Sequence, residues 1–474
     1  MSRVSGAVFS AVYALSAVVA GCTGSQPVAG SNGPAPDSAD YPSGPVPSID
    51  MANLTACDWI LANDPETTPV PSGWIDLKAG YWTFKMSKNF PVGIRVRIDG
   101  QYPNTRFFSI AAEEGIGTVV DSRADYRIAP LTDGTSPFVG QSTYDPTIAP
   151  GAPYKAYLVL GPKPAQSAKN AIYIDPTTLP SSTQDILVIM RMYNPPPGQA
   201  IAKAGNVPLP KLTVETAQGD VPLSSFKPGT ASCQATFNSQ AAISTLGTEI
   251  ISAGEAKPQA PGPIPPQPVP AAPAFVIYRP SNTKLSANLT INPDVQYGYW
   301  TLSQTAGDLV YLRALVPGYV TQPGVGAQPH STEDNAQVRH WAVCTNGSKL
   351  VNSRTFACAE DYTASIDSDG YYNVLISIPG KKPAASLLAK GYDWLTYGQT
   401  TTDLPIYRQL VPSPDYGQAM ANVSDDNVTN EGQIANVMGA YMPQATYCGS
   451  TVFATHVQNG ESHAQVFAAC QAGK

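Results

Sequence analysis

The sequence is poor in charge and lacks the short motifs that mark most enzyme classes. Asp, Glu, Lys and Arg make up 13% of its 474 residues, about half the usual share. The net charge is −7 and there is no basic patch, which argues against nucleic acid as a partner. No P-loop, G-x-S-x-G or G-x-G-x-x-G sequence occurs, so no nucleotide, hydrolase or dinucleotide site is recognisable.

Metal-binding spacings are missing as well. The chain has only 4 His and contains neither H-E-x-x-H nor C-x-x-C, the spacings of zinc and thioredoxin-like sites. His330 and His340 flank a loop that also holds two carboxylates, and we keep them as weak ligand candidates. Residues 367–370 resemble part of a calcium loop, but the distal Glu is absent, so we predict a hairpin turn there. The sequence therefore predicts no metal and no cofactor.

No apolar run is long enough to span a membrane. The N-terminal run, Ala7 to Ala20, holds about 14 residues, whereas a spanning helix needs about 20. It follows Arg3 and ends at Val19-Ala20-Gly21-Cys22, which matches a lipobox. Residues 1–22 are therefore predicted to be a lipoprotein signal peptide, with Cys22 carrying the lipid that holds an exported protein to the bacterial membrane or cell surface. An ordinary secretory signal cleaved nearby, leaving Cys22 as a free thiol, is the alternative.

Seven cysteines are present, and lipidation of Cys22 leaves an even number. Six cysteines outside the cytoplasm suit three disulfides, which can be connected in about 15 ways. Spacing favours Cys344–Cys358 across a hairpin and Cys448–Cys470 within the C-terminal segment. Cys57–Cys233 then remains, joining the two ends of the first domain.

The composition favours an all-β protein with proline-rich connections, since the chain has 46 Pro and 24 Tyr against 12 Phe. Short apolar or alternating runs bounded by Pro and Gly are typical of strands. They lie at 94–98, 157–160, 186–190 and 374–378. We expect two tandem antiparallel β-sandwich domains of jelly-roll type, followed by a small helical appendage.

An internal duplication supports two domains. Tyr81-Trp82-Thr83 and Tyr299-Trp300-Thr301 each open a similar order of landmarks, and Trp82 lies 109 positions before Arg191 while Trp300 lies 108 before Arg408. The predicted organisation is a flexible linker, a first sandwich, a proline-rich linker, a second sandwich that repeats the first, and a helical, disulfide-tied C-terminal segment. The ranges are 23–50, 51–254, 255–273, 274–415 and 416–474.

Two arginine–aspartate pairs recur in both copies. Arg106 precedes Asp125 by 19 positions and Arg339 precedes Asp361 by 22. On neighbouring strands of one copy, each pair would form a charge-assisted contact. A carboxylate or sugar site is the functional interpretation, but recurrence in both copies favours buried ion pairs that fix strand register.

One family resemblance is carried by the second copy. It rests on Arg339-His340-Trp341-Ala342-Val343-Cys344, then Cys358 with the acidic residues after it, then Asp367 to Tyr372. These runs resemble the R-Y-W-S-x-C and D-x-D-G-x-Y motifs of an uncharacterised group of bacterial exported proteins and lipoproteins. His340 stands where the group has an aromatic residue, and Ala342 where it has Ser. The resemblance implies a β architecture and export, and it implies no reaction.

The leading functional hypothesis is a non-enzymatic, membrane-anchored lipoprotein that binds a partner or forms part of the envelope. A protein or a glycan is the expected kind of partner, in addition to the membrane reached through the lipid. A carbohydrate-binding or carbohydrate-active envelope protein is one alternative, because Trp82, Trp300, Trp341 and Trp394 are able to stack on sugar rings. A hydrolase using His340 and Asp361 is another.

Overall fold

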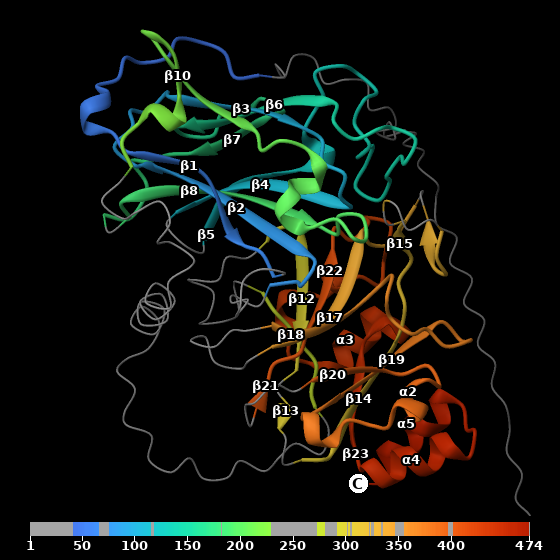
Figure 1. The fold of residues 1–474 in the computed structure, drawn as a ribbon. Helices are drawn as coiled ribbons and strands as arrows, with labels where there is room; N and C mark the ends of the chain where they lie inside the picture. The colour runs from blue at the N-terminus through green and yellow to red at the C-terminus, as the bar shows by residue number, and fades with distance from the viewer. Residues whose placement is uncertain are drawn as a thin grey trace, which may run out of the picture. The chain divides into compact units, whose positions relative to one another are not determined.

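The computed structural model describes most of the chain after residue 40, and its strands are coloured from blue to red along the sequence in Figure 1. The described residues are 41–65, 75–114, 118–181, 183–228, 273–279, 292–300, 302–303, 306–321, 323, 327–332, 335–346, 355–396 and 402–473. The predicted signal peptide with Cys22, most of the 23–50 tether, Cys233 and nearly all of the 255–273 linker lie outside them. No helix among the described residues is long and apolar enough to cross a membrane.

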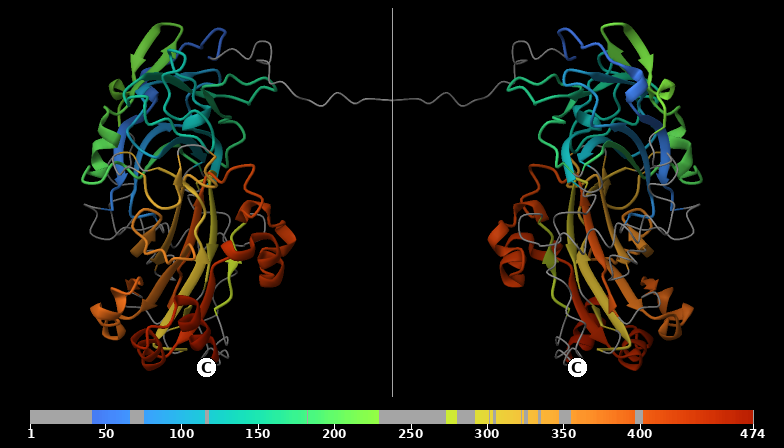
Figure 2. Two further views of the ribbon diagram at one scale, coloured as in Figure 1. Left: turned by 90° about the vertical axis from the view of Figure 1, so that its right-hand side faces the viewer. Right: turned by 90° about the vertical axis from the view of Figure 1, so that its left-hand side faces the viewer.

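Two five-stranded sheets form the first sandwich, drawn in blue to green in Figures 1 and 2. One sheet has the order β1-β2-β8-β4-β5, and the other β10-β9-β3-β6-β7. The strands are β1 (Ala56–Asn63), β2 (Ala79–Ser87), β3 (Arg95–Gln101), β4 (Phe107–Glu114), β5 (Thr118–Ala124), β6 (Pro153–Leu160), β7 (Ala171–Ile174), β8 (Asp185–Tyr193), β9 (Lys211–Thr216) and β10 (Gly219–Pro222).

The second sandwich, in yellow to red, has sheets in the orders β11-β12-β22-β17-β18 and β20-β19-β14-β23. Its strands are β11 (Val276–Ile277), β12 (Val295–Tyr299), β14 (Leu309–Leu315), β17 (His340–Asn346), β18 (Thr355–Glu360), β19 (Tyr371–Ser377), β20 (Asp393–Thr396), β22 (Ile406–Leu410) and β23 (Gln444–Cys448). Two small pairs accompany them: β13 (Leu302–Ser303) with β21 (Thr402–Asp403), and β15 (Tyr319–Val320) with β16 (Ser331–Thr332).

The chain thus folds as the expected all-β protein with two tandem sandwiches, and the two share one topology. The first sheets match strand for strand and all their pairs are antiparallel. The second sheets match over four strands, each ending in a parallel pair, β6 with β7 and β19 with β20, while β10 has no counterpart in the four-stranded sheet. This arrangement is the one that the predicted internal duplication leads us to expect; the duplication and the domain boundaries remain predictions.

The register of one strand departs from the landmarks read in the sequence. Ala79 of β2 pairs with Tyr193, and Val295 of β12 pairs with Leu410, so Tyr81 corresponds to Tyr297 and not to Tyr299. Because side chains alternate between the two faces of a strand, a shift of two residues keeps the same face inward. Trp82 and Trp300 therefore both lie in sandwich cores despite the shift.

Burial follows the position of each strand. In β3, every second residue is buried, as expected for a strand with one face on the core and one on solvent. In β8, all residues after Asp185 are buried, and β17 is buried throughout. These two strands lie inside their sheets, and their apolar runs are typical of strands covered on both faces.

The C-terminal segment is helical, as predicted, but it also completes a sheet. Its helices are α3 (Glu431–Met438), α4 (Ser450–Gln458) and α5 (His463–Ala472), and a short α2 (Ala385–Leu388) precedes them. Strand β23 lies between α3 and α4 and pairs with β14, in the place that β9 takes beside β3. The sequence missed this strand because it is short and surrounded by helical patterns.

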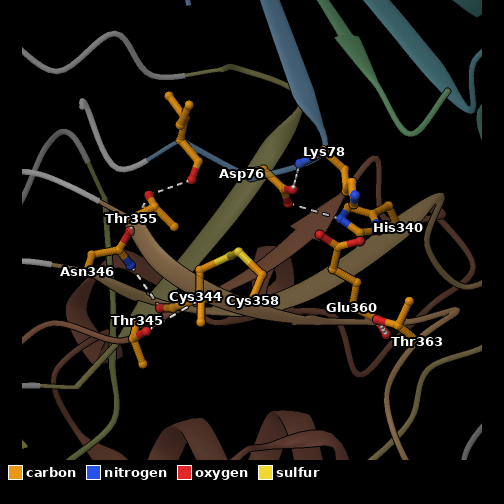
Figure 3. The surroundings of a disulfide bond; sticks show 12 residues. Asp76, Lys78, His340, Cys344, Thr345, Asn346, Thr355, Cys358, Glu360 and Thr363 are labelled. Atoms are coloured by element: carbon orange, nitrogen blue, oxygen red, sulfur yellow. Dashed lines mark hydrogen bonds and ion pairs between the residues drawn. A yellow bond between two sulfur atoms is a disulfide. The ribbon is translucent and has the colours of Figure 1, made fainter. Parts of the chain in front are cut away.

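Two of the predicted disulfides are confirmed. Cys344 and Cys358 lie directly opposite on β17 and β18, with their Cα atoms 4.1 Å apart, as Figure 3 shows. Cys448 at the end of β23 is bonded to Cys470 of α5. Cys57 is also disulfide-bonded, but its predicted partner Cys233 lies outside the described residues.

Candidate functional site

The recurring arginines and aspartates meet where the two sandwiches touch, and they exchange partners there. Arg106 Nη1 lies 2.5 Å from Asp361 Oδ2, and Arg339 Nη1 lies 3.0 Å from Asp125 Oδ2. All four side chains are fully buried. The expected ion pairs therefore exist, but the pairing within each copy, Arg106 with Asp125 and Arg339 with Asp361, was wrong. We call this region the joint.

Each aspartate is fixed within its own sandwich by backbone amides. Asp125 follows β5 and accepts hydrogen bonds from the amides of Phe108 and Tyr126. Asp361 follows β18 and accepts from the amides of Trp341 and Tyr362. The carboxylates cannot turn toward an arginine elsewhere without losing these bonds, so the longer arginine side chains cross the joint instead.

The contacts of the arginines repeat on both sides of the joint. Arg106 Nη1 donates to the carbonyl oxygen of Arg339, and Arg339 Nη1 donates to the carbonyl oxygen of Arg106, at 3.4 and 3.2 Å. Each guanidinium also lies over a tyrosine ring of the opposite sandwich, Tyr362 for Arg106 and Tyr126 for Arg339. Each of these tyrosines directly follows the aspartate with which the arginine pairs. Reciprocal contacts of this kind are those of an isologous interface, formed here within one chain.

Apolar side chains surround the ion pairs. A buried cluster draws on strand ends of both sandwiches, and partly buried tyrosines pack on it. Its buried members are Ala79, Phe107, Ala124, Tyr193, Val295, Leu410 and Val411. The cluster excludes water from the charges and so strengthens their attraction.

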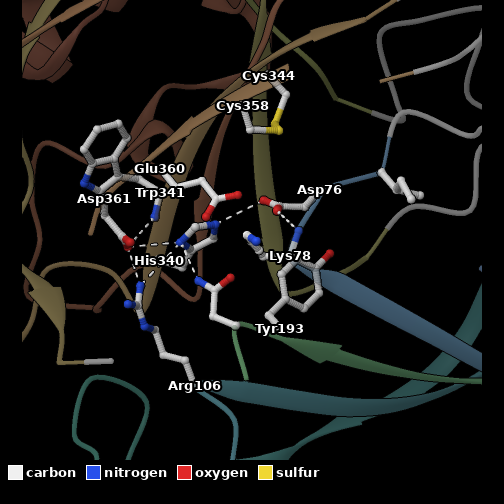
Figure 4. A network of polar contacts seen from close by, with 12 residues as sticks. Asp76, Lys78, Arg106, Tyr193, His340, Trp341, Cys344, Cys358, Glu360 and Asp361 are labelled. Atoms are coloured by element: carbon white, nitrogen blue, oxygen red, sulfur yellow. Dashed lines mark hydrogen bonds and ion pairs between the residues drawn. A yellow bond between two sulfur atoms is a disulfide. The ribbon is translucent and has the colours of Figure 1, made fainter. Parts of the chain in front are cut away.

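His340, the first residue of β17, is the histidine of the joint and is buried. Its Nδ1 lies 3.0 Å from Asp361 Oδ2 and 2.9 Å from the side-chain amide of Asn194, and its Nε2 lies 3.1 Å from Asp76 Oδ2. Figure 4 shows the ring held between Asp361 and Asp76, with Arg106 on the Asp361 carboxylate. The imidazole thus joins a carboxylate of the first sandwich to one of the second.

Electrostatics favour a charged His340. Burial alone would lower its pKa, but the charges and hydrogen bonds of Asp361 and Asp76 raise it to about 9. Burial would raise the pKa of Asp76, yet the hydrogen bond and charge of His340 lower it to about 2. Arg106 and His340 likewise hold the pKa of Asp361 below its usual value against burial. At neutral pH the ring is an imidazolium between two carboxylates.

The opposite side of the joint carries no such pair. By the strand register, Phe107 is the counterpart of His340, and Asn292 is the counterpart of Asp76. An aromatic ring and an amide therefore replace the imidazolium and the carboxylate. The two halves share their arginine–aspartate exchange but differ in the polar contact beside it.

Glu360, the last residue of β18, is a further acid of the joint. It is 3% exposed, and its Oε2 has no hydrogen-bond partner. Burial, together with the charge of Asp76, raises its pKa to about 8 even though His340 and Lys78 act in the opposite direction. Its carboxyl group is therefore mostly protonated at neutral pH.

The other sequence candidates lie elsewhere. Trp82, Trp300 and Trp341 are 2%, 0% and 0% exposed, so their faces are not available to sugars. Trp394 is half-buried under the Lys382 ammonium. His330 is exposed, whereas His340 is buried, and the two carboxylates of its loop, Glu333 and Asp334, lie outside the described residues.

Residues 367–370 form the predicted turn. Asp367 accepts hydrogen bonds from the amides of Asp369 and Tyr371, and Gly370 has a φ of 84°, which favours glycine. Asp367 also pairs with Arg313. The carboxylate is thus used to close the hairpin.

Three residues of the joint were missed by sequence reasoning: Asp76, Asn194 and Glu360. Each stands alone in the sequence, and no spacing links residues that are brought together from positions so far apart. One signal was present for Glu360, since it lies directly before the recurring Asp361 and two positions after Cys358.

Comparisons with known proteins add no activity. No protein-family model matches the chain, and no curated protein matches it. Among solved structures, an uncharacterised protein from Burkholderia cenocepacia is similar over 77% of this chain and 79% of its own, with 13% identity and a TM-score of 0.43. A BSP domain of a biofilm-associated protein matches over 79% of this chain and 52% of its own, with 6% identity and a TM-score of 0.18.

Proposed function

We propose that the chain is a membrane-anchored bacterial lipoprotein that displays two locked β-sandwiches as a non-enzymatic binding or structural element of the envelope. The anchor rests on the Val19-Ala20-Gly21-Cys22 sequence and on the polar segment that follows it. The second part rests on one observation, the reciprocal exchange of Arg106 and Arg339 across the joint.

The joint favours a structural role because the side chains that could act as an acid or base are buried in it, where a substrate cannot contact them. A catalytic acid or base must contact its substrate, whereas both ring nitrogens of His340 are taken by carboxylates and the ring is 1% exposed. The hydrolase alternative, which needs His340 and Asp361, therefore loses its support. The carbohydrate alternative is weakened too, because three of its four tryptophans lie in the cores.

Fractionation of cells tests the anchor. The native chain is expected in the membrane fraction, and Cys22→Ser is expected in the soluble exported fraction because two or three acyl chains are lost. Ala20→Ser serves as a control that keeps the cysteine and a small residue before it. Equal fractionation of the native chain and Cys22→Ser would refute the proposal.

Two measurements test partner binding. In the first, the purified chain is applied to immobilised glycans. In the second, envelope proteins are cross-linked in living cells to the native chain and, for comparison, to Cys22→Ser. A partner cross-linked only to the anchored chain supports an envelope role. Turnover of an envelope polymer that is lost in His340→Gln would instead establish the hydrolase.

A further inference from the structure

Two buried carboxylates from different sandwiches approach each other at the edge of the joint. Asp76 precedes β2 in the first sandwich, and Glu360 ends β18 in the second. Their side chains are 0% and 3% exposed, and carboxylate oxygens of the two lie within 4.8 Å of each other. Figures 3 and 4 show both groups pointing toward the same place beside the Cys344–Cys358 disulfide.

One of the two is incompletely satisfied. Glu360 Oε2 is buried and has no hydrogen-bond partner, and a buried polar atom in that state is costly. The carboxyl group lies close to Asp76 and Lys78, and it also has a hydrogen-bond contact with the Tyr362 side chain. A cation between the two carboxylates would satisfy both.

We propose that the joint binds one divalent transition-metal cation, with Asp76 and Glu360 as carboxylate ligands and His340 Nε2 as a third donor. The entering ion displaces the protons of Glu360 and of His340 Nε2 to solvent, while Nδ1 keeps its contact with Asp361. Nε2 lies 3.1 Å from Asp76 Oδ2, close to the separation of about 3.3 Å between two ligands on a tetrahedral ion with bonds near 2.0 Å. A set of one imidazole and two carboxylates suits Zn²⁺ or Mn²⁺. The ion would tie the first sandwich to the second.

Two neighbours define the chemistry further. Cys358 Sγ lies within the same 4.8 Å, but its bond to Cys344 keeps it from acting as a thiolate. The Lys78 side chain lies beside the two carboxylates (Figure 4), so an entering ion competes with its ammonium group. The sequence predicted no metal because these donors come from distant positions and leave no local spacing.

Metal titration of the purified chain tests the proposal. After removal of metals with a chelator, Mn²⁺ is added and the free ion is counted by electron paramagnetic resonance, with Zn²⁺ as competitor. One bound Mn²⁺ per chain, displaced by Zn²⁺, is expected. Glu360→Gln keeps the shape of the side chain and is expected to weaken binding by about 10- to 100-fold.

Two more variants guard against a folding defect. Asp294→Asn removes another acid whose Oδ2 is buried and lacks a hydrogen-bond partner, but arginines surround that acid, so binding should be unchanged. Lys78→Met removes the competing cation and should tighten binding, a gain that misfolding cannot produce. No binding by the native chain, or equal binding by native chain and Glu360→Gln, would overturn the proposal; Glu360 would then hold a proton only.

Discussion

At the scale of single residues, Arg106 and Arg339 decide how the sandwiches meet. Each side chain leaves its own sandwich and ends on an aspartate of the other. Because both aspartates are held by backbone amides of their own sandwich, their carboxylates need no reorientation to meet the arginines. The ion pairs therefore favour this one arrangement of the two sandwiches.

Removal of one arginine should be costly. Arg106→Met leaves Asp361 buried with only His340 as a charged partner, and breaking such a buried pair costs about 3 to 5 kcal/mol. The measurement is the denaturant midpoint of the purified chain. Arg97→Met is the control: its pairs with Asp99 and Asp220 are partly exposed, so a loss of no more than about 1 kcal/mol is expected. Equal losses would show that the exchange contributes little.

Asp125 should make stability depend on pH. Burial raises its pKa to about 7 in the folded chain even though Arg339 and two backbone amides act to lower it. Between about pH 4 and pH 7 the folded state therefore keeps a proton that the unfolded state has lost, so this group's contribution to stability falls as the pH rises, by at most about 1.4 kcal/mol per pH unit.

Unfolding of the native chain and of Asp125→Asn across this pH range checks the prediction. The native chain should lose stability relative to the variant as the pH increases from 4 to 7. A difference that stays constant over the range would contradict a raised pKa for Asp125.

At the scale of elements, the joint is built from strand ends. Arg106 and Arg339 directly precede β4 and β17, while Asp125 and Asp361 directly follow β5 and β18. The same two places are used in both sandwiches because the topology is the same. The C-terminal segment also contributes to the sheets, because its strand β23 pairs with β14 before the chain continues into α4 and α5.

The Cys448–Cys470 disulfide should hold α5 against β23. Replacing both cysteines with serine removes a bridge that spans 22 positions, which by chain entropy corresponds to about 3 kcal/mol. Hydrogen exchange should increase in α4 and α5, while β23 stays protected by its pairing with β14. Cys344→Ser with Cys358→Ser is the comparison and should leave exchange in α5 unchanged.

At the scale of the whole molecule, residues 39–474 form one compact unit that contains both sandwiches. The two sandwiches have corresponding sheet orders, and the joint connects them into one body. A partner would meet this body as a whole, as the proposed binding or structural role requires.

Cutting the chain between the sandwiches tests this unity. A specific protease site is introduced within residues 255–273, and the cleaved protein is examined by size-exclusion chromatography. The two fragments are expected to elute together, and Arg106→Met combined with Arg339→Met should release them. Separation of the native fragments after cleavage would show that the joint is weak.

Much of the architecture was predictable from the sequence. Alternating and apolar runs placed β3, β6, β8 and β19, because side-chain burial follows strand periodicity. Cysteine spacing gave two disulfides, since residues opposite each other in a hairpin or neighbouring elements are close in sequence. The recurring arginines and aspartates were identified as buried ion pairs.

The sequence by itself thus determined the fold class and the local disulfides, which depend on short-range patterns. Only the tertiary structure decided that Arg106 meets Asp361 and that Arg339 meets Asp125. Two similar halves offer either pairing, and the choice depends on backbone amides that hold each aspartate in place. The same docking brings Asp76 to His340 and Glu360, an approach that no spacing along the chain records.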